Sequence, residues 1–299
     1  MKTILNALAL FCFSPWPALA ALNIFACEPE WGALAQELGG DKLSVFSATT
    51  ALQDVHRIEA RPSLIARIRS ADLVVCSGSE LEVGWLPLLL AQSGNNRIQP
   101  GSPGYLEASQ FVVRLEIPKV LDRSLGDIHP GGNPHIHTDA RNIARVADVV
   151  SERLAQLDPA NAPVYKTRAA SFQERWRAAI QRWEREGARL KEVPVVVYHR
   201  DFSYFIQWMG MREVGSLEPK PGIPPTPAHL ADLVERMKRN PAKLIVYSPY
   251  NNPKAAEYLS AQAGIPAAMM PFTVGGSDPA KDLFGLFDDT IARLLTAVK

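Results

Sequence analysis

The sequence predicts an α/β protein of two lobes, each with a mostly parallel sheet flanked by helices, joined by one long backbone helix. Short apolar runs alternate with amphipathic segments along most of the chain, which is typical of parallel sheets covered by helices. One segment, from about Ala162 to Lys191, has no proline after Pro163 and presents a single apolar face. The 299 residues, 47% hydrophobic and 21% charged, are sufficient for two domains. We place the lobes at residues 21–158 and 193–299, with the linking helix at 159–192.

Residues 1–20 have the pattern of a cleavable signal peptide. The stretch MKTILNALALFCFSPWPALA carries one Lys, an apolar run, two prolines and a closing Ala-Leu-Ala, and the apolar run is too short for a permanent membrane anchor. Bulky Phe11 before Cys12 does not suit a lipoprotein signal. We therefore expect export to the periplasm as a soluble protein cut near Ala20 or Ala21.

The N-terminal lobe is predicted from apolar runs that alternate with helical segments along the chain. The expected strands are 22–27, 42–50 and 72–78, and the expected helices are 30–40, 63–71, 80–94 and 140–157. The first helix is closed by a glycine C-cap.

The linking helix is predicted from apolar residues recurring at three- and four-residue steps. They are Tyr165, Ala169, Phe172, Trp176, Ala179, Ile180 and Trp183, which form one face of a helix roughly 40 Å long. Because that exceeds the usual helix length in globular proteins, we expect it to join two lobes.

The C-terminal lobe follows the same alternation. Strands are expected at 194–199 and 243–248, and helices at 202–210 and 283–298. The net charge is +1 and the basic residues are scattered, so neither a nucleic-acid partner nor a polybasic membrane patch is indicated.

Two cysteines remain once Cys12 is removed with the signal peptide. Cys27 and Cys76 each end an apolar run that resembles a buried strand, and neighbouring strand ends could bring them together in an oxidising compartment. Cysteine is also a common core residue, so the residues alone leave the disulfide open.

Three of the six histidines follow predicted strands or precede predicted helices. His56 lies in the loop after the second strand, His135 in a glycine-proline loop before a helix, and His199 at the end of PVVVYH. Ligands of open α/β sheets bind beyond the carboxyl ends of strands, so these histidines are expected to converge on an interlobe metal site. Taken singly, His56 also fits an exposed loop and His199 a satisfied core position. His135 is not distinguished from His129 and His137, and His229 is expected on the surface.

Four segments in order resemble the solute-binding components of metal ABC importers, the cluster A-I family that includes the ZnuA and TroA proteins. They are DVHRIEARPSLIARIRSADLVVCSGSELE, GGNPHIHTDARN, VVVYHRDFSYFIQWMGM and EPKPGIPPTPAHLADL. Val55 stands where the family usually has proline. The resemblance covers essentially the whole mature chain and implies two α/β lobes with a metal between them.

The resemblance implies a ligand set of His56, His135 and His199, with a fourth ligand from the loop before the last helix. Asp278 is the first candidate for that ligand and Asp282 the second; Glu59 or water would serve otherwise. His129 and His137 are expected to support the ligands or to lie exposed in the loop, where they could capture the ion. Manganese members tend to place a carboxylate where this chain has His199, and three imidazoles suit Zn²⁺ better than Mn²⁺.

The function implied is a periplasmic, monomeric zinc-binding protein, not an enzyme, which captures Zn²⁺ in the cleft and delivers it to an ABC permease. Two alternatives remain at this point. A zinc hydrolase would also use three histidines and a water, and a manganese-type importer component would share the fold.

Overall fold

A computed structural model describes residues 21–122, 124 and 126–298. The predicted signal peptide therefore lies outside the described residues. Among those residues, no helix combines the length and apolar character needed to cross a membrane.

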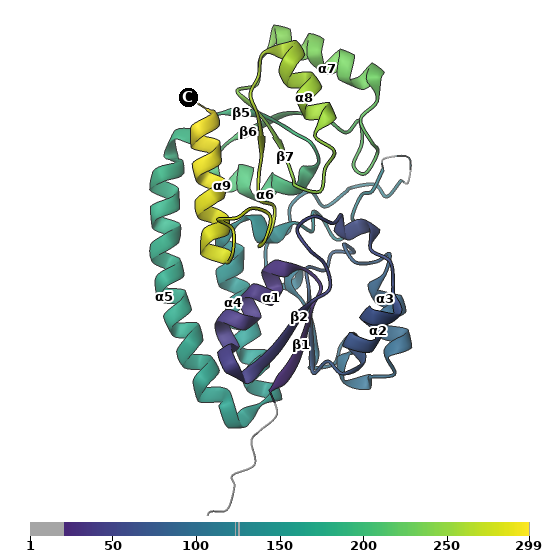
Figure 1. Ribbon diagram of the computed structural model, residues 1–299, viewed down its shortest axis with the longest axis vertical. Coiled ribbons are helices and arrows are strands. Elements are labelled where there is room, and N and C mark those ends of the chain that lie inside the picture. Colours follow the sequence, from purple (N-terminus) through teal and green to yellow (C-terminus); the bar gives the residue numbers. More distant parts are fainter. Residues whose placement is uncertain (1–20, 123, 125, 299) are drawn as a thin grey trace, which may run out of the picture.

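Two four-stranded parallel sheets form the centres of two lobes (Figure 1). The first has the order β2-β1-β3-β4 and the second β6-β5-β7-β8, with every pairing parallel. The strands are β1 Leu22–Ala26, β2 Leu43–Ser47, β3 Leu73–Cys76, β4 Tyr105–Glu107, β5 Pro194–Val197, β6 Arg212–Ser216, β7 Leu244–Tyr247 and β8 Ala267–Met269. The fold class predicted from the sequence is confirmed.

Helices cover both faces of each sheet. They are α1 Pro29–Gly39, α2 Pro62–Arg69, α3 Leu86–Ser93, α4 Ala140–Leu157, α5 Ala162–Gly187, α6 Ser203–Met209, α7 Pro227–Arg239, α8 Lys254–Ala263 and α9 Leu283–Ala297. Alternate side chains of a strand point to opposite faces. Accordingly Val195 and Val197 of β5 join the core shared by the two lobes, whereas Val196 packs under α7 and α8.

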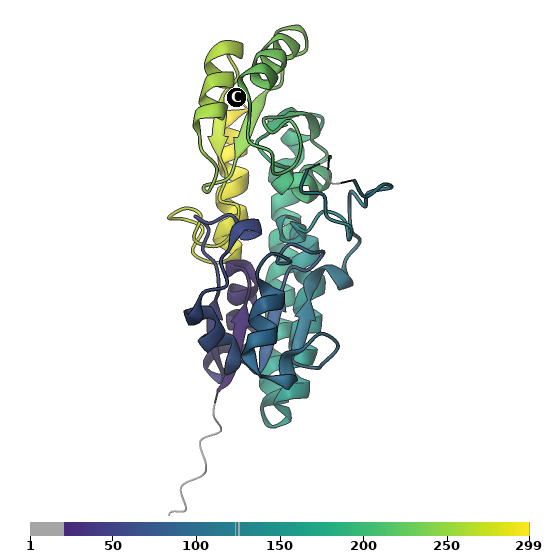
Figure 2. The same ribbon diagram turned by 90° about the vertical axis from the view of Figure 1, so that its right-hand side faces the viewer.

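The long helix α5 runs along one side of both lobes, which are stacked end to end (Figures 1 and 2). Its Trp176 and Trp183 are fully buried and lie edge-on or tilted against Phe287 of α9, with centroids 5.6 and 5.0 Å apart. A single hydrophobic core thus continues from one lobe into the other along α5 and α9. This continuity favours small movements between the lobes over a wide hinge opening.

The helix predicted at 80–94 is shorter than expected. Gly78, Ser79 and Glu80 all have positive φ values of 77°, 52° and 65°, which no right-handed helix accommodates. The helix α3 begins only at Leu86, with Pro87 in its first turn, where proline is tolerated.

A disulfide joins Cys27 to Cys76, whose Cα atoms are 4.8 Å apart. Cys27 directly follows β1, Cys76 is the last residue of the adjacent parallel strand β3, and both are fully buried. The sulfur atoms lie near Glu82, but their mutual bond leaves no thiolate for a metal.

Loss of this disulfide should destabilise the protein. Its loop spans 49 residues, and releasing such a loop in the unfolded chain costs about 2–4 kcal/mol of unfolding free energy. We expect that loss in denaturant unfolding of the Cys27→Ala/Cys76→Ala variant. The wild type should show a similar loss under strong reductant, whereas the variant should not respond to it. Equal stability of the oxidised wild type and the variant would contradict the prediction.

Candidate metal centre

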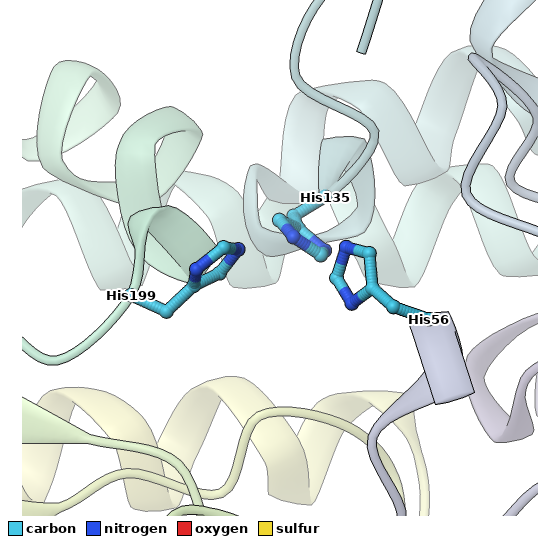
Figure 3. Close-up of side chains that lie close together, drawn as sticks. All are labelled: His56, His135 and His199. Atoms are coloured by element: carbon cyan, nitrogen blue, oxygen red, sulfur yellow. The ribbon is translucent and has the colours of Figure 1, made fainter. Parts of the chain in front are cut away.

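Three histidines from separate chain segments meet between the lobes (Figure 3). His56 lies in a 3₁₀ turn, Val55–Arg57, after β2; His135 precedes the 3₁₀ turn Ile136–Thr138 before α4; His199 follows β5. Their ring centroids are 5.5, 5.5 and 5.6 Å apart, and one ligand atom of each lies within 4.8 Å of the others. Ligand atoms of tetrahedral zinc lie about 3.3–3.4 Å apart, so inward shifts of less than about 1 Å per ring would close the set.

The His56 ring is oriented by Asp54, two residues before it. Oδ1 of Asp54 accepts a hydrogen bond from the His56 backbone N–H at 3.0 Å and lies 2.8 Å from Nδ1 of the ring. Burial opposes ionisation of Asp54, but the hydrogen bonds and charge of His56 lower the pKa of Asp54. The carboxylate therefore accepts a hydrogen bond from Nδ1–H of His56. In the neutral ring Nε2 then carries no proton, and its lone pair can bind a metal.

His199 is oriented in the same way from the other lobe. Its Nδ1 lies 2.7 Å from Oε2 of Glu218, which also accepts a hydrogen bond from the Gly222 N–H at 2.9 Å. Burial alone would lower the pKa of His199, but the Glu218 hydrogen bond and the charges of Asp201, Glu218 and Asp54 raise it to about 9. Metal-free His199 is thus an imidazolium near neutral pH and must lose a proton to bind a cation.

His135 is the most enclosed of the three. Its side chain is 2% exposed, and neither ring nitrogen has a hydrogen-bond partner among the described residues. Burial, reinforced by the positive charges of His56 and His199, holds the pKa of His135 well below its usual range. A buried polar atom without a partner is costly, and a metal ion in the cluster would supply that partner.

Asp201 is a buried carboxylate beside the cluster that the sequence analysis did not single out. Its Oδ1 lies 3.7 Å from Nε2 of His135, and it accepts hydrogen bonds from the hydroxyls of Ser248 and Tyr250. Asp54 was also missed, although its position two residues before His56 is a local signal. Glu218 carries no such signal, because it reaches His199 from β6 and the loop that follows.

The structure does not bring the predicted carboxylates to the three histidines. Asp278 is exposed in the loop before α9. Asp282 is also exposed, and its Oδ1 caps α9 by accepting from the Gly285 N–H at 2.8 Å. Glu59 is exposed as well. In this conformation a fourth ligand must come from another residue or from water.

His137 is a buried residue rather than an exposed loop residue. Its side chain is 1% exposed, Nδ1 lies 3.0 Å from Oε1 of Glu30, and Nε2 lies 3.1 Å from the Phe272 carbonyl. The Phe272 ring packs edge-on against both His135 and His137, and Thr273 donates to Glu30 of α1. This contact ties the loop before α9 to the N-terminal lobe next to His135.

His229 is half-buried, and its Nε2 lies 2.9 Å from the Ser216 carbonyl. It lies on α7, outside the histidine cluster.

The space beside the histidines suits an ion rather than an organic molecule. One cavity of about 90 Å³ is lined by His129, His135 and His199, and another of about 180 Å³ by His56, His199 and Glu218. Both are smaller than the ~300–1,000 Å³ of typical small-molecule sites.

Replacing Glu218 with Gln should weaken metal binding by the histidine cluster about 10- to 100-fold, as expected for the loss of a partner that orients a metal-bound histidine. The neutral amide no longer favours the His199 imidazolium, so the pKa of His199 should fall as well. Chelator competition and histidine NMR titration of the metal-free protein would measure the two effects. An unchanged pKa of His199 would contradict the assigned role of Glu218.

The two parallel-sheet lobes, the long connecting helix and the interlobe histidines define a two-lobed binding protein for a small cation. The chain belongs to the ZnuA family, periplasmic component A of the zinc-uptake complex, which matches residues 24–297.

Curated relatives include both zinc and manganese proteins. The zinc-binding lipoprotein AdcA of Streptococcus pneumoniae is 22% identical over 258 residues, covering 85% of this chain and 50% of AdcA. The chain thus spans about half the length of that relative. The manganese ABC transporter substrate-binding lipoprotein PsaA of the same species is 21% identical over 294 residues, covering 91% of this chain and 90% of PsaA.

Solved structures share the fold. A crystal structure of ZnuA has a TM-score of 0.74 at 21% identity, covering 91% of this chain and 99% of that one. A manganese-bound periplasmic metal-binding protein from Candidatus Liberibacter asiaticus also has a TM-score of 0.74, at 17% identity, covering 93% of this chain and 100% of the other. These structures show the shared fold, and the family match with the curated relatives places the chain among solute-binding proteins rather than enzymes.

Proposed function

We propose that this protein binds one Zn²⁺ ion through His56, His135 and His199 in the periplasm and delivers it to an ABC permease. The observation that carries the proposal is the convergence of three imidazoles from both lobes on one point, with ligand atoms within 4.8 Å. Two of the rings are held by carboxylates, which is the usual support of a metal-bound histidine.

The choice of zinc over manganese rests on the ligand chemistry. Mn²⁺ prefers carboxylate and other oxygen ligands, whereas imidazole suits Zn²⁺. In this site Asp54 hydrogen-bonds to the His56 ring and Glu218 to the His199 ring. These carboxylates therefore orient the imidazole ligands. The relatives alone do not separate the two metals, because they include AdcA and PsaA at nearly equal identity.

Export and delivery are supported by the family and by the signal-peptide pattern of residues 1–20. The hydrolase alternative loses its support, because the chain belongs to a family of solute-binding proteins.

Metal analysis of protein purified without added metal tests the proposal. We expect one zinc per chain and a Zn²⁺ affinity at least about 100-fold above that for Mn²⁺, as the ligand preferences imply. Cells lacking the gene should grow poorly under zinc limitation and recover with added zinc but not with manganese. A manganese affinity equal to or above the zinc affinity would overturn the choice of metal.

A further inference from the structure

A fourth histidine, His129, lies against the cluster from the loop between β4 and α4. Its Nε2 is 3.2 Å from Nε2 of His56, and the two ring centroids are 5.2 Å apart. His129 also lines the 90 Å³ cavity together with His135 and His199. His129 thus contacts His56 directly and shares a cavity with the other two histidines.

The separation of the two Nε2 atoms fits shared coordination. Two nitrogen ligands bound to tetrahedral zinc at the usual bond lengths lie about 3.3–3.4 Å apart. The observed 3.2 Å is close to that edge length. His129 is not among the residues whose ligand atoms all lie within 4.8 Å of one another, so its ring would have to move toward His135 and His199 to join the set.

The Nε2 atoms of the two rings face each other. Nδ1 of His56 faces the Asp54 carboxylate, so its Nε2 is without a proton in the neutral ring. Two ring nitrogens 3.2 Å apart need a proton or a cation between them, and a metal ion bound by both would meet that need.

The chain holds His129 in this place by unusual backbone geometry. Ser79 and Glu80 both adopt left-handed φ values, a strained conformation for residues with side chains. Gly131 allows the close approach, because a Cβ there would lie 3.1 Å from Cα of Ser79. On the other side, the Asp127 N–H donates to the Pro221 carbonyl at 2.8 Å, which ties the loop to the C-terminal lobe.

The rival protein donor for a fourth position is Asp201. Its two carboxylate oxygens already accept hydrogen bonds from Ser248 and Tyr250, whereas the hydrogen-bond contact of His129 Nε2 among the described residues is with the His56 ring. Ligation by Asp201 would weaken those bonds, while ligation by His129 would replace only its contact with the His56 ring.

We propose that His129 is the fourth ligand and completes an all-imidazole zinc site. It replaces the carboxylate expected from the sequence and makes position 129 the determinant of selectivity against Mn²⁺. The inference rests on the proposed function, since it takes zinc as the ion bound by the other three histidines.

The test compares the wild type with His129→Gln and His129→Asp by zinc X-ray absorption and by chelator competition. The wild-type spectrum should fit four imidazoles, and that of His129→Gln three imidazoles and one oxygen ligand without the outer-shell scattering of an imidazole ring. His129→Gln should lower zinc affinity about 10- to 100-fold, less than the loss expected for alanine at the other three histidines, because the Gln amide oxygen or a water takes the open position. His129→Asp should retain zinc binding but lower the preference for Zn²⁺ over Mn²⁺ by about tenfold or more, because a carboxylate suits Mn²⁺.

His229→Gln is the matched control, because that histidine is half-buried on α7 and outside the cluster; its zinc affinity and spectrum should equal those of the wild type. A wild-type spectrum with three imidazoles, and an unchanged affinity in His129→Gln, would overturn the inference. If His135→Ala still lost zinc, the proposed function would stand. A wild type that binds no zinc would overturn both.

Discussion

Replacing His135 with Ala is expected to lower zinc affinity about 1,000-fold, with similar losses for His56→Ala and His199→Ala. Structural zinc sites supply ~10–16 kcal/mol, and one of three or four protein ligands carries about 4 kcal/mol of that, or three orders of magnitude. His135 should show the effect most clearly, because its ring is buried and has no hydrogen-bond partner among the described residues. Its removal takes away a ligand without breaking a hydrogen bond of the ring.

Competition with a chelator of known affinity would measure these losses. Asp278→Ala is the control, because Asp278 is exposed in the loop before α9 and outside the histidine cluster. That variant should keep the wild-type affinity and zinc off-rate. A wild-type affinity in any one of the three histidine variants would remove that residue from the proposed ligand set, and a faster zinc off-rate in Asp278→Ala would restore the carboxylate predicted from the sequence.

Zinc affinity should also fall as the pH is lowered, by about tenfold per unit between pH 8 and 7. The pKa of His199 is raised to about 9 by Glu218 and Asp201 despite burial, so the metal-free ring is protonated throughout this range. Zinc must displace that proton, and each unit of pH below the raised pKa therefore costs a factor of about ten. His135 adds nothing here, because burial holds its pKa well below its usual range and keeps it neutral.

Calorimetry in buffers of different ionisation enthalpy would count the released protons. We expect close to one proton per zinc at pH 7.5, and a release that declines as the pH approaches 9. In Glu218→Gln the release at pH 7.5 should be smaller, because the imidazolium has lost its partner. A zinc affinity independent of pH between 7 and 8 would contradict the protonated state of His199.

The local sequence pattern was sufficient to predict most helices and the buried strands. The apolar runs of β1, β3, β5 and β7 lie at the centres of their sheets, where both faces are covered and a continuous apolar run is required. The edge strands β4, β6 and β8 were missed. They are short or only partly buried, so they need no such run and are defined by pairing with a neighbour.

The three histidines could be selected from the sequence because each stands where a strand passes into a loop or a loop into a helix. Parallel topology carries such positions to the carboxyl edge of a sheet, and two sheets facing each other bring them together. Their order along the chain was enough to select them once the resemblance to metal-binding importer components was noted.

The surroundings of those histidines were decided by the tertiary structure. Glu218 reaches His199 across neighbouring strands, Asp201 is buried between Ser248 and Tyr250, and His129 meets His56 across 73 positions of the chain. No periodicity or spacing encodes these contacts, because a loop's path depends on what it packs against. The sequence alone thus determined the α/β class, the long helix and the candidate histidines, whose signals are local. Which fourth group faces the ion depends on how loops from two lobes fold over each other, and only the assembled structure could show that Asp278 lies outside the histidine cluster and His129 beside it.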